Sequence, residues 1–520
     1  MIPDIENLPD DISDLRDVVV AYSREACLLT EENRLLREKI RHLELRLYAR
    51  KSEKETVDPS VQPSLFDEAE SVVEEPAGEI PVPAHTRKKS GRRPIPAELP
   101  REDVIHDIPE EEKVCACGCA LTRIGEEVSE KLDVIPPQVR VLRHVRYKYA
   151  CRCCEGVESD GGAVKTAAIS PQIIPQGIAT PGLLAFVLTS KYADAMPLYR
   201  QEKIFERIGV ELSRSTLASW VVQIGQRLDP VMEAARQVLL TSPVVGSDET
   251  TVQVMKEPGR ANTTRSYMWV FRGESRDGPI VMFQYHPTRS GSVPAELFEK
   301  YEGIVQVDGY ANYDALEAGG KVRLAGCWAH VRRKFVEAAR VAKGSGKTGS
   351  ADVAIGMIRQ LYAIESRAAD GGLSPEAIRQ LRQEEARPIV ERFGQWLEKR
   401  RGETPPKGLL GKAISYALGQ WSRLTIYLED GRLRIDNNLV ENAIRPFALG
   451  RKNWLFSGHP RGAKASANIY SLIETAKANG LEPYRYLRCL LERLPYAQTA
   501  DDFKALLPPF IKAQLPDSSI

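Results

Sequence analysis

The first pattern along the chain is a heptad repeat of apolar residues from residue 12 to about residue 50. One set of heptad positions holds Leu15, Tyr22, Leu29, Leu36 and Leu43, and the other holds Ile12, Val19, Ala26, Asn33, Ile40 and Leu47. A buried asparagine among apolar seam residues favours a parallel dimer in fixed register. An amphipathic helix packed on its own protein shows such a stripe over two or three heptads, which is shorter than this one. We therefore predict an intermolecular coiled coil over residues 1–51, with seam contacts from Leu15, Leu29, Asn33, Leu36 and Leu43.

The periodicity stops after this segment and returns as helices further on. Residues 52–100 are acidic and rich in proline, which predicts a disordered linker. The linker ends in a basic run, either a DNA contact or a solvated tail, that contains Arg87, Lys88, Lys89, Arg92 and Arg93. Over residues 171–243 two helical patterns flank Gly209, with Ser213 placed to cap the second helix. This is helix-turn-helix spacing that would leave Arg214 and Ser215 facing a DNA groove, although other α domains contain similar hairpins.

Alternating apolar residues next predict five strands within residues 244–334, and hence a mixed α/β sheet. Asp248 interrupts the first strand and Asp308 follows the fourth, so we place both at strand ends. A bulge and a turn would explain the two aspartates separately. Residues 335–430 have a helical pattern, and the glycine-rich segment 344–349 follows a helix rather than a strand, which predicts a flexible loop rather than a phosphate-binding loop. Two further helices are predicted within residues 459–520.

Composition narrows the class of protein. The chain has 520 residues, of which 42% are hydrophobic and 28% charged, as expected for three or four globular domains. The net charge is only +1, so a polyanion must be bound by local patches such as Arg332, Arg333 and Lys334. The acidic N-terminus and the lack of a long apolar run predict a soluble, cytoplasmic protein with no membrane partner.

Six of the nine cysteines lie between Cys115 and Cys154, which in a reducing compartment indicates metal binding. Cys151 and Cys154 have C-x-x-C spacing, whereas the first cluster offers only C-x-C or C-x-x-x-C pairs. We predict one structural zinc ion in a ribbon-like module over residues 101–165, and His144 is an alternative ligand. The predicted ligands are Cys151, Cys154, Cys117 and either Cys115 or Cys119.

Residues 431–458 combine acids, amides and cations more densely than any other segment flanked by apolar residues. Asn438 and Glu441 have the spacing of a capped helix start, and Pro446 predicts that this helix ends early. Three cations and two exposed-type aromatic residues follow: Arg445, Arg451, Lys452, Trp454 and Phe456. Glu441 is either a capping glutamate or a metal ligand. Its local rivals as a ligand are Glu429, Asp430 and Asp436, and Glu441 is favoured because a helix fixes its direction.

Two acids at strand ends and one on a later helix can meet at one point of a sheet. Three such carboxylates repel one another unless cations neutralise them. Two Mg²⁺ ions, or Mn²⁺ as an alternative, would do so and would promote in-line attack on a phosphodiester. Cys327 and His330 also have metal-ligand spacing, but a matching second pair is absent, so packing against the acids is their favoured role.

Four segments give this chain a family resemblance: SDET around Asp248, QVDGY around Asp308, CWAHVRRKF from Cys327, and residues 436–458. Together they resemble the insertion-sequence-66 family of transposases, over nearly the whole chain. The resemblance implies a multidomain α/β protein whose RNase H-like mixed-sheet core (244–334 and 431–458) is split by the helical insertion 335–430. It implies a DDE triad of Asp248, Asp308 and Glu441, and small accessory proteins of the same element. The family's cysteine module usually begins C-x-x-C-G, unlike the C-x-C-G-C here.

The implied function is binding of the element's terminal inverted repeats, followed by metal-dependent strand cleavage and strand transfer. Homodimers or higher oligomers would act on double-stranded DNA. A DNA-binding repressor with a decayed nuclease core and a structure-specific nuclease are alternatives, and the presence of all three acids favours the transposase. The predicted DNA contacts are Arg87, Lys88, Lys89, Arg92, Arg93, Arg214, Ser215, Arg332, Arg333, Lys334, Arg445, Arg451 and Lys452.

Overall fold

The computed structural model describes residues 11–48, 103, 105, 138–150, 164–342 and 349–512. The chain divides into two compact units, residues 71–167 and the remainder. In the smaller unit, strands β1 (Lys148–Ala150) and β2 (Val164–Thr166) pair antiparallel. The predicted linker with its basic run, the six clustered cysteines and most of the glycine-rich segment 344–349 lie outside the described residues. None of the helices in the described ranges combines the length and apolar character that a membrane span requires.

The heptad segment forms one continuous helix, α1 (Ile12–Tyr48). Its seam residues Leu29, Leu36 and Leu43 are all exposed, at 53%, 50% and 47% of their surface. Exposed leucines at regular heptad spacing gain stability only when another surface covers them. The helix is therefore as the sequence predicted, and its pairing with a second helix stays a prediction.

Four helices lie between β2 and the first strand of the large sheet: α2 (Pro181–Tyr192), α3 (Leu198–Arg207), α4 (Arg214–Arg227) and α5 (Asp229–Leu239). Between α3 and α4, Gly209 adopts φ of 80°, a turn conformation that favours glycine. The Ser213 hydroxyl accepts a hydrogen bond from the Thr216 backbone N–H at 3.2 Å, so Ser213 caps α4. Arg214 and Ser215 are exposed at the start of that helix.

All five strands expected from the alternating pattern are present, and they form a mixed sheet in the order β5-β4-β3-β6-β7. The antiparallel half consists of β3 (Val244–Val254), β4 (Arg265–Ser275) and β5 (Gly278–His286). The short strands β6 (Gly303–Gln306) and β7 (Val322–Ala325) add in parallel on the other side of β3. A two-residue strand, β8 (Phe456–Ser457), pairs in parallel with the far end of β3.

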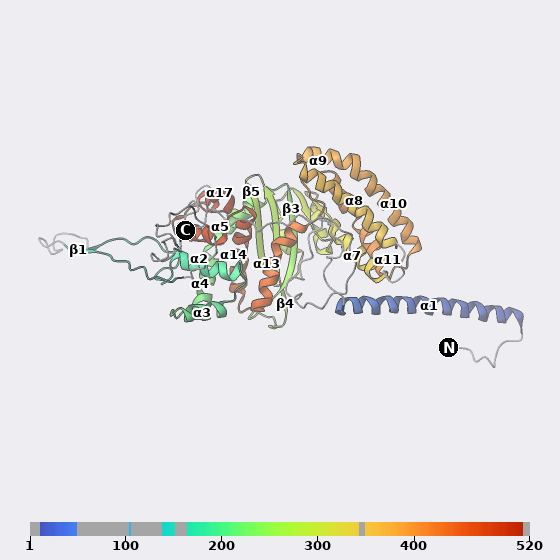
Figure 1. Ribbon diagram of the computed structural model, residues 1–520, viewed down its shortest axis with the longest axis horizontal. Helices are drawn as coiled ribbons and strands as arrows, with labels where there is room; N and C mark the ends of the chain where they lie inside the picture. The colour runs from blue at the N-terminus through green and yellow to red at the C-terminus, as the bar shows by residue number, and fades with distance from the viewer. Residues whose placement is uncertain are drawn as a thin grey trace, which may run out of the picture. The chain divides into compact units, whose positions relative to one another are not determined.

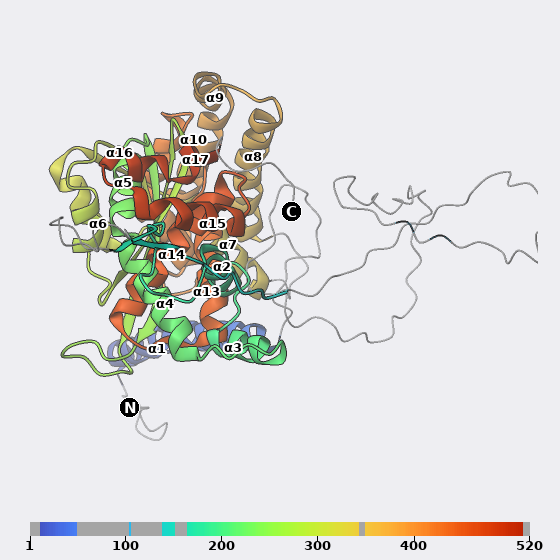
Figure 2. The same cartoon turned by 90° about the vertical axis from the view of Figure 1, so that its left-hand side faces the viewer.

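Both faces of the sheet are covered. Successive residues of a strand point to opposite faces, and β4 is buried without interruption from Met268 to Phe271. On one face lie α13 (Asn438–Trp454) and α14 (Pro460–Ala478) (Figure 1). Their Phe447 and Tyr470 rings pack on Phe283 of β5. On the other face, Trp269 and Phe271 of β4 contact Tyr313 and Phe298. The 3-10 helix η3 (Ala311–Gly319) and α6 (Ser292–Leu297) belong to this side. Three C-terminal helices near α14 complete the hydrophobic core around the sheet (Figure 2): α15 (Pro483–Arg493), α16 (Ala500–Ala505) and α17 (Pro508–Ile511).

The helical block between β7 and α13 surrounds a second hydrophobic core, with Trp328, Phe335 and Phe393 at its centre. It begins with α7 (Trp328–Ala342), α8 (Ser350–Asp370) and α9 (Pro375–Leu381). A π-helical turn (Arg382–Ala386) leads into α10 (Arg387–Glu403), α11 (Leu409–Gly419) and α12 (Trp421–Thr425), which is followed by a 3-10 turn (Ile426–Leu428). Figure 1 shows α8, α9, α10 and α11 together, apart from the sheet. The block is thus inserted between β7 and the helix that carries Glu441.

Helix α13 differs from the sequence-based prediction at both ends. It continues through Pro446 to Trp454, although an internal proline removes one hydrogen bond and costs roughly 3 kcal/mol. The buried face that contains Ile444 and Phe447 packs on the sheet and offsets this cost. At the start, the N-cap position is Asn437 rather than Asn438, and its side chain makes no capping hydrogen bond.

Candidate active site

The two candidate aspartates have matching positions in the sheet. The parallel pairing of β3 with β6 ends at the pair Gly246 and Gln306, and each aspartate lies two residues further along its own chain. Asp308 follows the end of β6, as predicted. Asp248 lies in the middle of β3 rather than at its end, because β3 continues past its parallel partner while still paired with β4. The structure therefore brings the two aspartates to the same edge of the parallel half-sheet.

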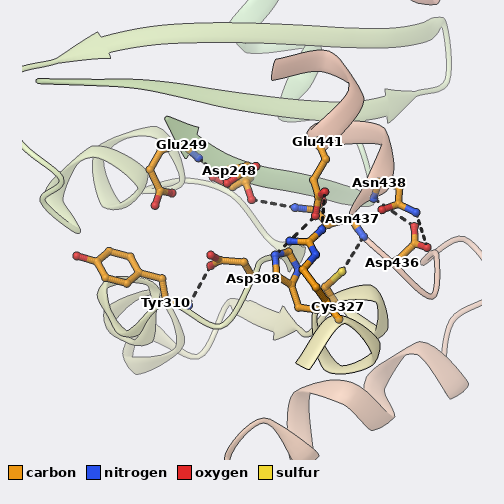
Figure 3. Close-up of polar contacts among 12 residues, drawn as sticks. Asp248, Glu249, Asp308, Tyr310, Cys327, Asp436, Asn437, Asn438 and Glu441 are labelled. Carbon is orange, nitrogen blue, oxygen red and sulfur yellow. Dashed lines mark hydrogen bonds and ion pairs between the residues drawn. The ribbon is translucent and has the colours of Figure 1, made fainter. Parts of the chain in front are cut away.

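Asp248 is buried and interacts with the charges of three other carboxylates. Burial raises the pKa of its carboxyl group well above the usual range, and the neighbouring Glu249 carboxylate raises it further. The charges of Asp308 and Glu441 act in the same direction. The backbone N–H of Glu249 donates to Asp248 Oδ1 at 2.8 Å and partly opposes the shift. The three candidate acids are thus close enough to influence one another (Figure 3).

Asp308 and Glu441 are oriented by different means. Asp308 Oδ1 accepts the backbone N–H of Tyr310 at 3.0 Å, and the Asp308 carbonyl accepts the Tyr416 hydroxyl at 2.5 Å. Glu441 lies in the first turn of α13 and faces α7, where Arg333 Nη2 donates to Glu441 Oε2 at 3.2 Å. The backbone N–H groups of Asn437 and Asn438 donate to Cys327 Sγ and Asp436 Oδ1 rather than to Glu441, so the capping-glutamate interpretation of Glu441 is wrong.

A fourth acid, Glu249, was not singled out from the sequence. Its side chain is 2% exposed and accepts hydrogen bonds from Arg289 Nε at 2.6 Å and from the Tyr313 hydroxyl at 2.9 Å. The Arg289 guanidinium in turn stacks on Tyr310, 3.5 Å from the ring centre. Because Glu249 is already paired with a cation, it anchors the loop beside Asp308. Its position next to Asp248 in SDET was the only sequence signal for this role.

Helix α13 is held close to β3 by two residues that the sequence analysis also missed. Asn437 is 2% exposed, and its Nδ2 donates to the carbonyl of Ser247 at 3.0 Å. Gly246 makes the approach possible, since a Cβ there would lie 2.3 Å from Val440 Cγ2 and 2.6 Å from Asn437 Oδ1. These contacts fix the first turn of α13, and with it Glu441, beside Asp248.

The rival acids are engaged elsewhere. Asp436 Oδ2 accepts hydrogen bonds from the Tyr362 hydroxyl at 2.9 Å and from Asn438 Nδ2 at 2.8 Å. Glu429 pairs with Arg323, and Asp430 pairs with Arg432. Compared with Glu429, Asp430 and Asp436, Glu441 is the carboxylate whose charge raises the pKa of Asp248.

The predicted DNA contacts that the structure describes lie on several elements. On α7, Lys334 Nζ lies 4.5 Å from the centre of the Tyr416 ring, and Arg333 contacts Glu441. On α13, Arg445 is half-buried, and Arg451 Nη1 reaches the hydroxyls of Thr250 and Thr251 at 3.2 and 3.1 Å. Burial lowers the pKa of Arg451.

Two cavities flank the last turn of α13. A cavity of about 320 Å³ is lined by Arg265, Arg451, Lys452 and Leu455, among others. A second, of about 340 Å³, is lined by Arg200, Lys203, Arg207 and Asn453, among others. Trp454 is half-buried rather than exposed, because it packs against Tyr192 and Tyr470, whereas Phe456 is exposed. Both cavities therefore carry cationic side chains, and the first lies further along β3 than the acids.

The donor atoms of the acidic cluster fit a hard divalent cation. Asp248, Asp308 and Glu441 offer carboxylate oxygens only, which Mg²⁺ prefers. Glu441 Oε1 is buried without a hydrogen-bond partner, so one ligand atom is available for a cation. Burial and the charges of the neighbouring carboxylates raise the pKa of Asp248, which a bound cation would counteract.

Comparison with known proteins identifies the class. Residues 176–465 match the model described as "Transposase IS66 family", and the chain belongs to that family. Residues 112–155 match the zinc-finger binding domain of transposase IS66, and residues 471–508 match the IS66 C-terminal element. Residues 35–104 match the model described as "Transposase C of IS166 homeodomain".

Individual relatives span nearly the same length. The protein y4qI of Sinorhizobium fredii is 33% identical over 548 residues, covering 98% of each chain. The protein y4jD of the same organism is 34% identical over 427 residues, covering 80% of this chain and 81% of its own. The chain is thus a transposase of an insertion sequence, a DNA-binding protein with a zinc-finger domain and a family requirement for divalent metal.

Proposed function

We propose that this transposase cleaves and joins DNA strands at the ends of its insertion sequence, with Asp248, Asp308 and Glu441 as a DDE triad. The observation that carries the proposal is the matched offset of the two aspartates beyond the last parallel pair, with Glu441 docked beside them by α13. The order of three antiparallel strands followed by two parallel ones supports an RNase H-like core. In this proposal the helical block 335–430 is an insertion into that core.

In the proposed reaction the three carboxylates hold two Mg²⁺ ions. Bound Mg²⁺ supplies activation of the attacking water or 3′-hydroxyl and stabilisation of the leaving oxygen. The protein's own contribution is orientation. Gly246 and Asn437 fix the helix that directs Glu441, and the Tyr310 N–H fixes the Asp308 carboxylate. Arg333, whose side chain is 56% exposed, is placed to contact a phosphate beside Glu441.

We propose that DNA lies along the cationic surfaces on both sides of the triad. Arg332, Arg333 and Lys334 of α7 lie on one side, and the cavity beside Arg451 and Lys452 lies along β3 on the other. Gln253, which lines this cavity, is five residues beyond Asp248 in β3, which at roughly 3.3 Å per residue is about 17 Å. Duplex DNA rises about 3.4 Å per base pair along each strand, so this cavity would contact backbone about five base pairs from the cleavage point. Arg214 and Ser215 at the start of α4 would read the terminal repeat.

We further propose that the protein acts as a homodimer or higher oligomer through α1, with one structural zinc ion in the cysteine module and with small accessory proteins of the same element. The exposed leucine seam of α1 supports the oligomer. The zinc-finger match supports the zinc ion.

Replacement of Glu441 by glutamine tests the triad. Glu441→Gln keeps the volume of the side chain and removes the charge that would bind Mg²⁺. We expect magnesium-dependent cleavage of the element's own end to fall by orders of magnitude, while binding to that end persists. Cleavage and gel-shift assays on the same oligonucleotide measure both.

The matched control is Asp436→Asn, which alters a carboxylate five residues away that bonds to Tyr362 and Asn438. This variant should retain cleavage. Full cleavage by Glu441→Gln would refute the assignment, and loss of cleavage in Asp436→Asn alone would move the third acid to residue 436.

A further inference from the structure

A second group of potential metal ligands adjoins the acidic cluster on the side of α7. Cys327, at the start of α7, His330, in its first turn, and Glu441 of α13 place one ligand atom each within 4.8 Å of one another. The sequence showed the first two at metal-ligand spacing without a partner pair. The fold supplies the third ligand from a segment 111 residues further along the chain.

Two atoms of this group are buried and unsatisfied. His330 Nδ1 and Glu441 Oε1 have no hydrogen-bond partner, although leaving a buried polar atom unpaired is unfavourable. His330 Nε2 lies 3.6 Å from Glu441 Oε1, too far for a hydrogen bond. That separation suits two ligands of one ion, because bonds of about 2.0–2.1 Å in a tetrahedron leave ligand atoms roughly 3.3–3.5 Å apart.

The sulfur of this group is buried and already hydrogen-bonded. Cys327 is 2% exposed, and its Sγ accepts the backbone N–H of Asn437 at 3.3 Å and the backbone N–H of His330. Burial raises the pKa of the Cys327 thiol to about 12, and the two N–H groups oppose this shift only in part. A bound metal ion would therefore have to displace the thiol proton. Glu441 is already held by Arg333 through its other oxygen, Oε2, so Oε1 is free to bind an ion.

The donor set decides which cation fits. A thiolate, an imidazole nitrogen and a carboxylate oxygen form a set typical of Zn²⁺, whereas Mg²⁺ prefers oxygen ligands alone. A single carboxylate, Glu441, belongs to both sets. Zinc bound to Cys327 and His330 would draw Glu441 towards α7 and away from the aspartates.

We propose that Cys327, His330 and Glu441 form a second zinc site, distinct from the cysteine module, and that zinc in this site inhibits cleavage by withholding Glu441 from the magnesium ions. The inhibition rests on the proposed DDE function, whereas zinc binding at these three residues does not. Binding displaces the proton of the Cys327 thiol and fills the unsatisfied position on Glu441 Oε1.

Zinc content of the full-length protein tests the site directly. After equilibrium dialysis against buffered free zinc, elemental analysis should find one more zinc ion per chain in the unaltered protein than in Cys327→Ser or His330→Gln. The matched control is Cys489→Ser, which alters another buried free cysteine, on α15, and should keep the full zinc content. Thermal unfolding of each variant without added zinc checks that it is folded. Equal zinc content in the unaltered protein and in both folded site variants would overturn the proposal.

Zinc inhibition of magnesium-dependent cleavage tests the consequence. Each protein is compared with itself, with and without added zinc, so differences in basal activity cancel. We expect the concentration of zinc that halves cleavage to rise by about 10–100-fold in Cys327→Ser, the range seen when support of a metal site is lost. Inhibition of equal strength in the unaltered protein and Cys327→Ser would place the inhibitory zinc elsewhere and overturn the regulatory part. If no cleavage occurs under any condition, the proposed function fails while the zinc content still decides the site.

Discussion

The absence of a side chain at Gly246 allows α13 to bring Glu441, the candidate third acid, beside Asp248. Any larger side chain there would overlap Val440 and Asn437, which belong to the segment that carries Glu441. The glycine is therefore required by the close approach of α13 to β3 rather than by backbone conformation.

Gly246→Ala should displace the start of α13 and so reduce both stability and cleavage. Overpacking of this kind costs roughly 1–3 kcal/mol of unfolding free energy. Urea unfolding and the cleavage assay measure the two effects. Gly356→Ala is the control, because a Cβ at this position of α8 meets nothing within 4 Å, and the change should stabilise the helix by about 0.5–1 kcal/mol. Unchanged stability in Gly246→Ala would show that α13 tolerates a larger separation from β3.

Asp248 should make stability depend on pH in metal-free protein. Burial and the neighbouring carboxylates raise its pKa in the folded state, so the native state loses stability as the pH rises from the unfolded pKa, about 3.9, through the folded value. Asp248→Asn should therefore be more stable than the unaltered protein at neutral pH, with the difference vanishing towards pH 4.

Thermal unfolding across this pH range, without metal, measures the effect. Asp277→Asn, in the exposed turn between β4 and β5, is the control and should change little. Added Mg²⁺ should stabilise the unaltered protein more than Asp248→Asn. A stability difference that is independent of pH would contradict the electrostatic explanation.

At the scale of elements, helix α1 carries a seam that its own described surroundings leave exposed. Leu36→Lys and Leu43→Lys should weaken self-association of the full-length protein. Loss of one buried leucine costs roughly 1.5–3 kcal/mol, so each change should raise the dissociation constant about tenfold or more. Sedimentation velocity measures the oligomer. Leu28→Lys, on the same helix outside the seam, is the control, and a monomeric unaltered protein at tens of micromolar would disprove the coiled coil.

The elements that the sequence predicted well are those with a strong periodic pattern. The five strands and the 37-residue helix follow from apolar spacing alone. The extension of α13 past Pro446 did not follow, because a contact with Phe283, 164 positions earlier in the chain than Phe447, stabilises it. The three candidate acids were predicted from local motifs. Asn437 was missed because its importance depends on its contact with Ser247, 190 positions earlier in the chain.

At the scale of the whole molecule, the two compact units should respond differently to loss of zinc. A chelator should unfold the segment around residues 101–165, where the proposed zinc ion would take the place of a hydrophobic core, and leave the sheet intact. Hydrogen exchange by mass spectrometry should show rapid exchange in that segment and unchanged protection of β3, β4 and β5. Protection lost throughout the chain would mean that the units do not fold separately, and protein purified without chelators that contains no zinc would disprove the metal assignment.

The insertion between β7 and α13 has a consequence for synthesis on the ribosome. Asp308 and Glu441 are separated by 133 residues, which at about 5–20 residues per second take roughly 7–27 s to translate. During that interval the nascent chain has its cysteine module, its helical region and both aspartates, but not the third acid. A nonsense codon anywhere in the insertion would therefore encode a product that keeps the proposed DNA contacts Arg214, Ser215 and Arg332 but lacks those on α13 together with Glu441. Such a truncated allele would act as an inhibitor of the intact gene product rather than as a simple loss of it.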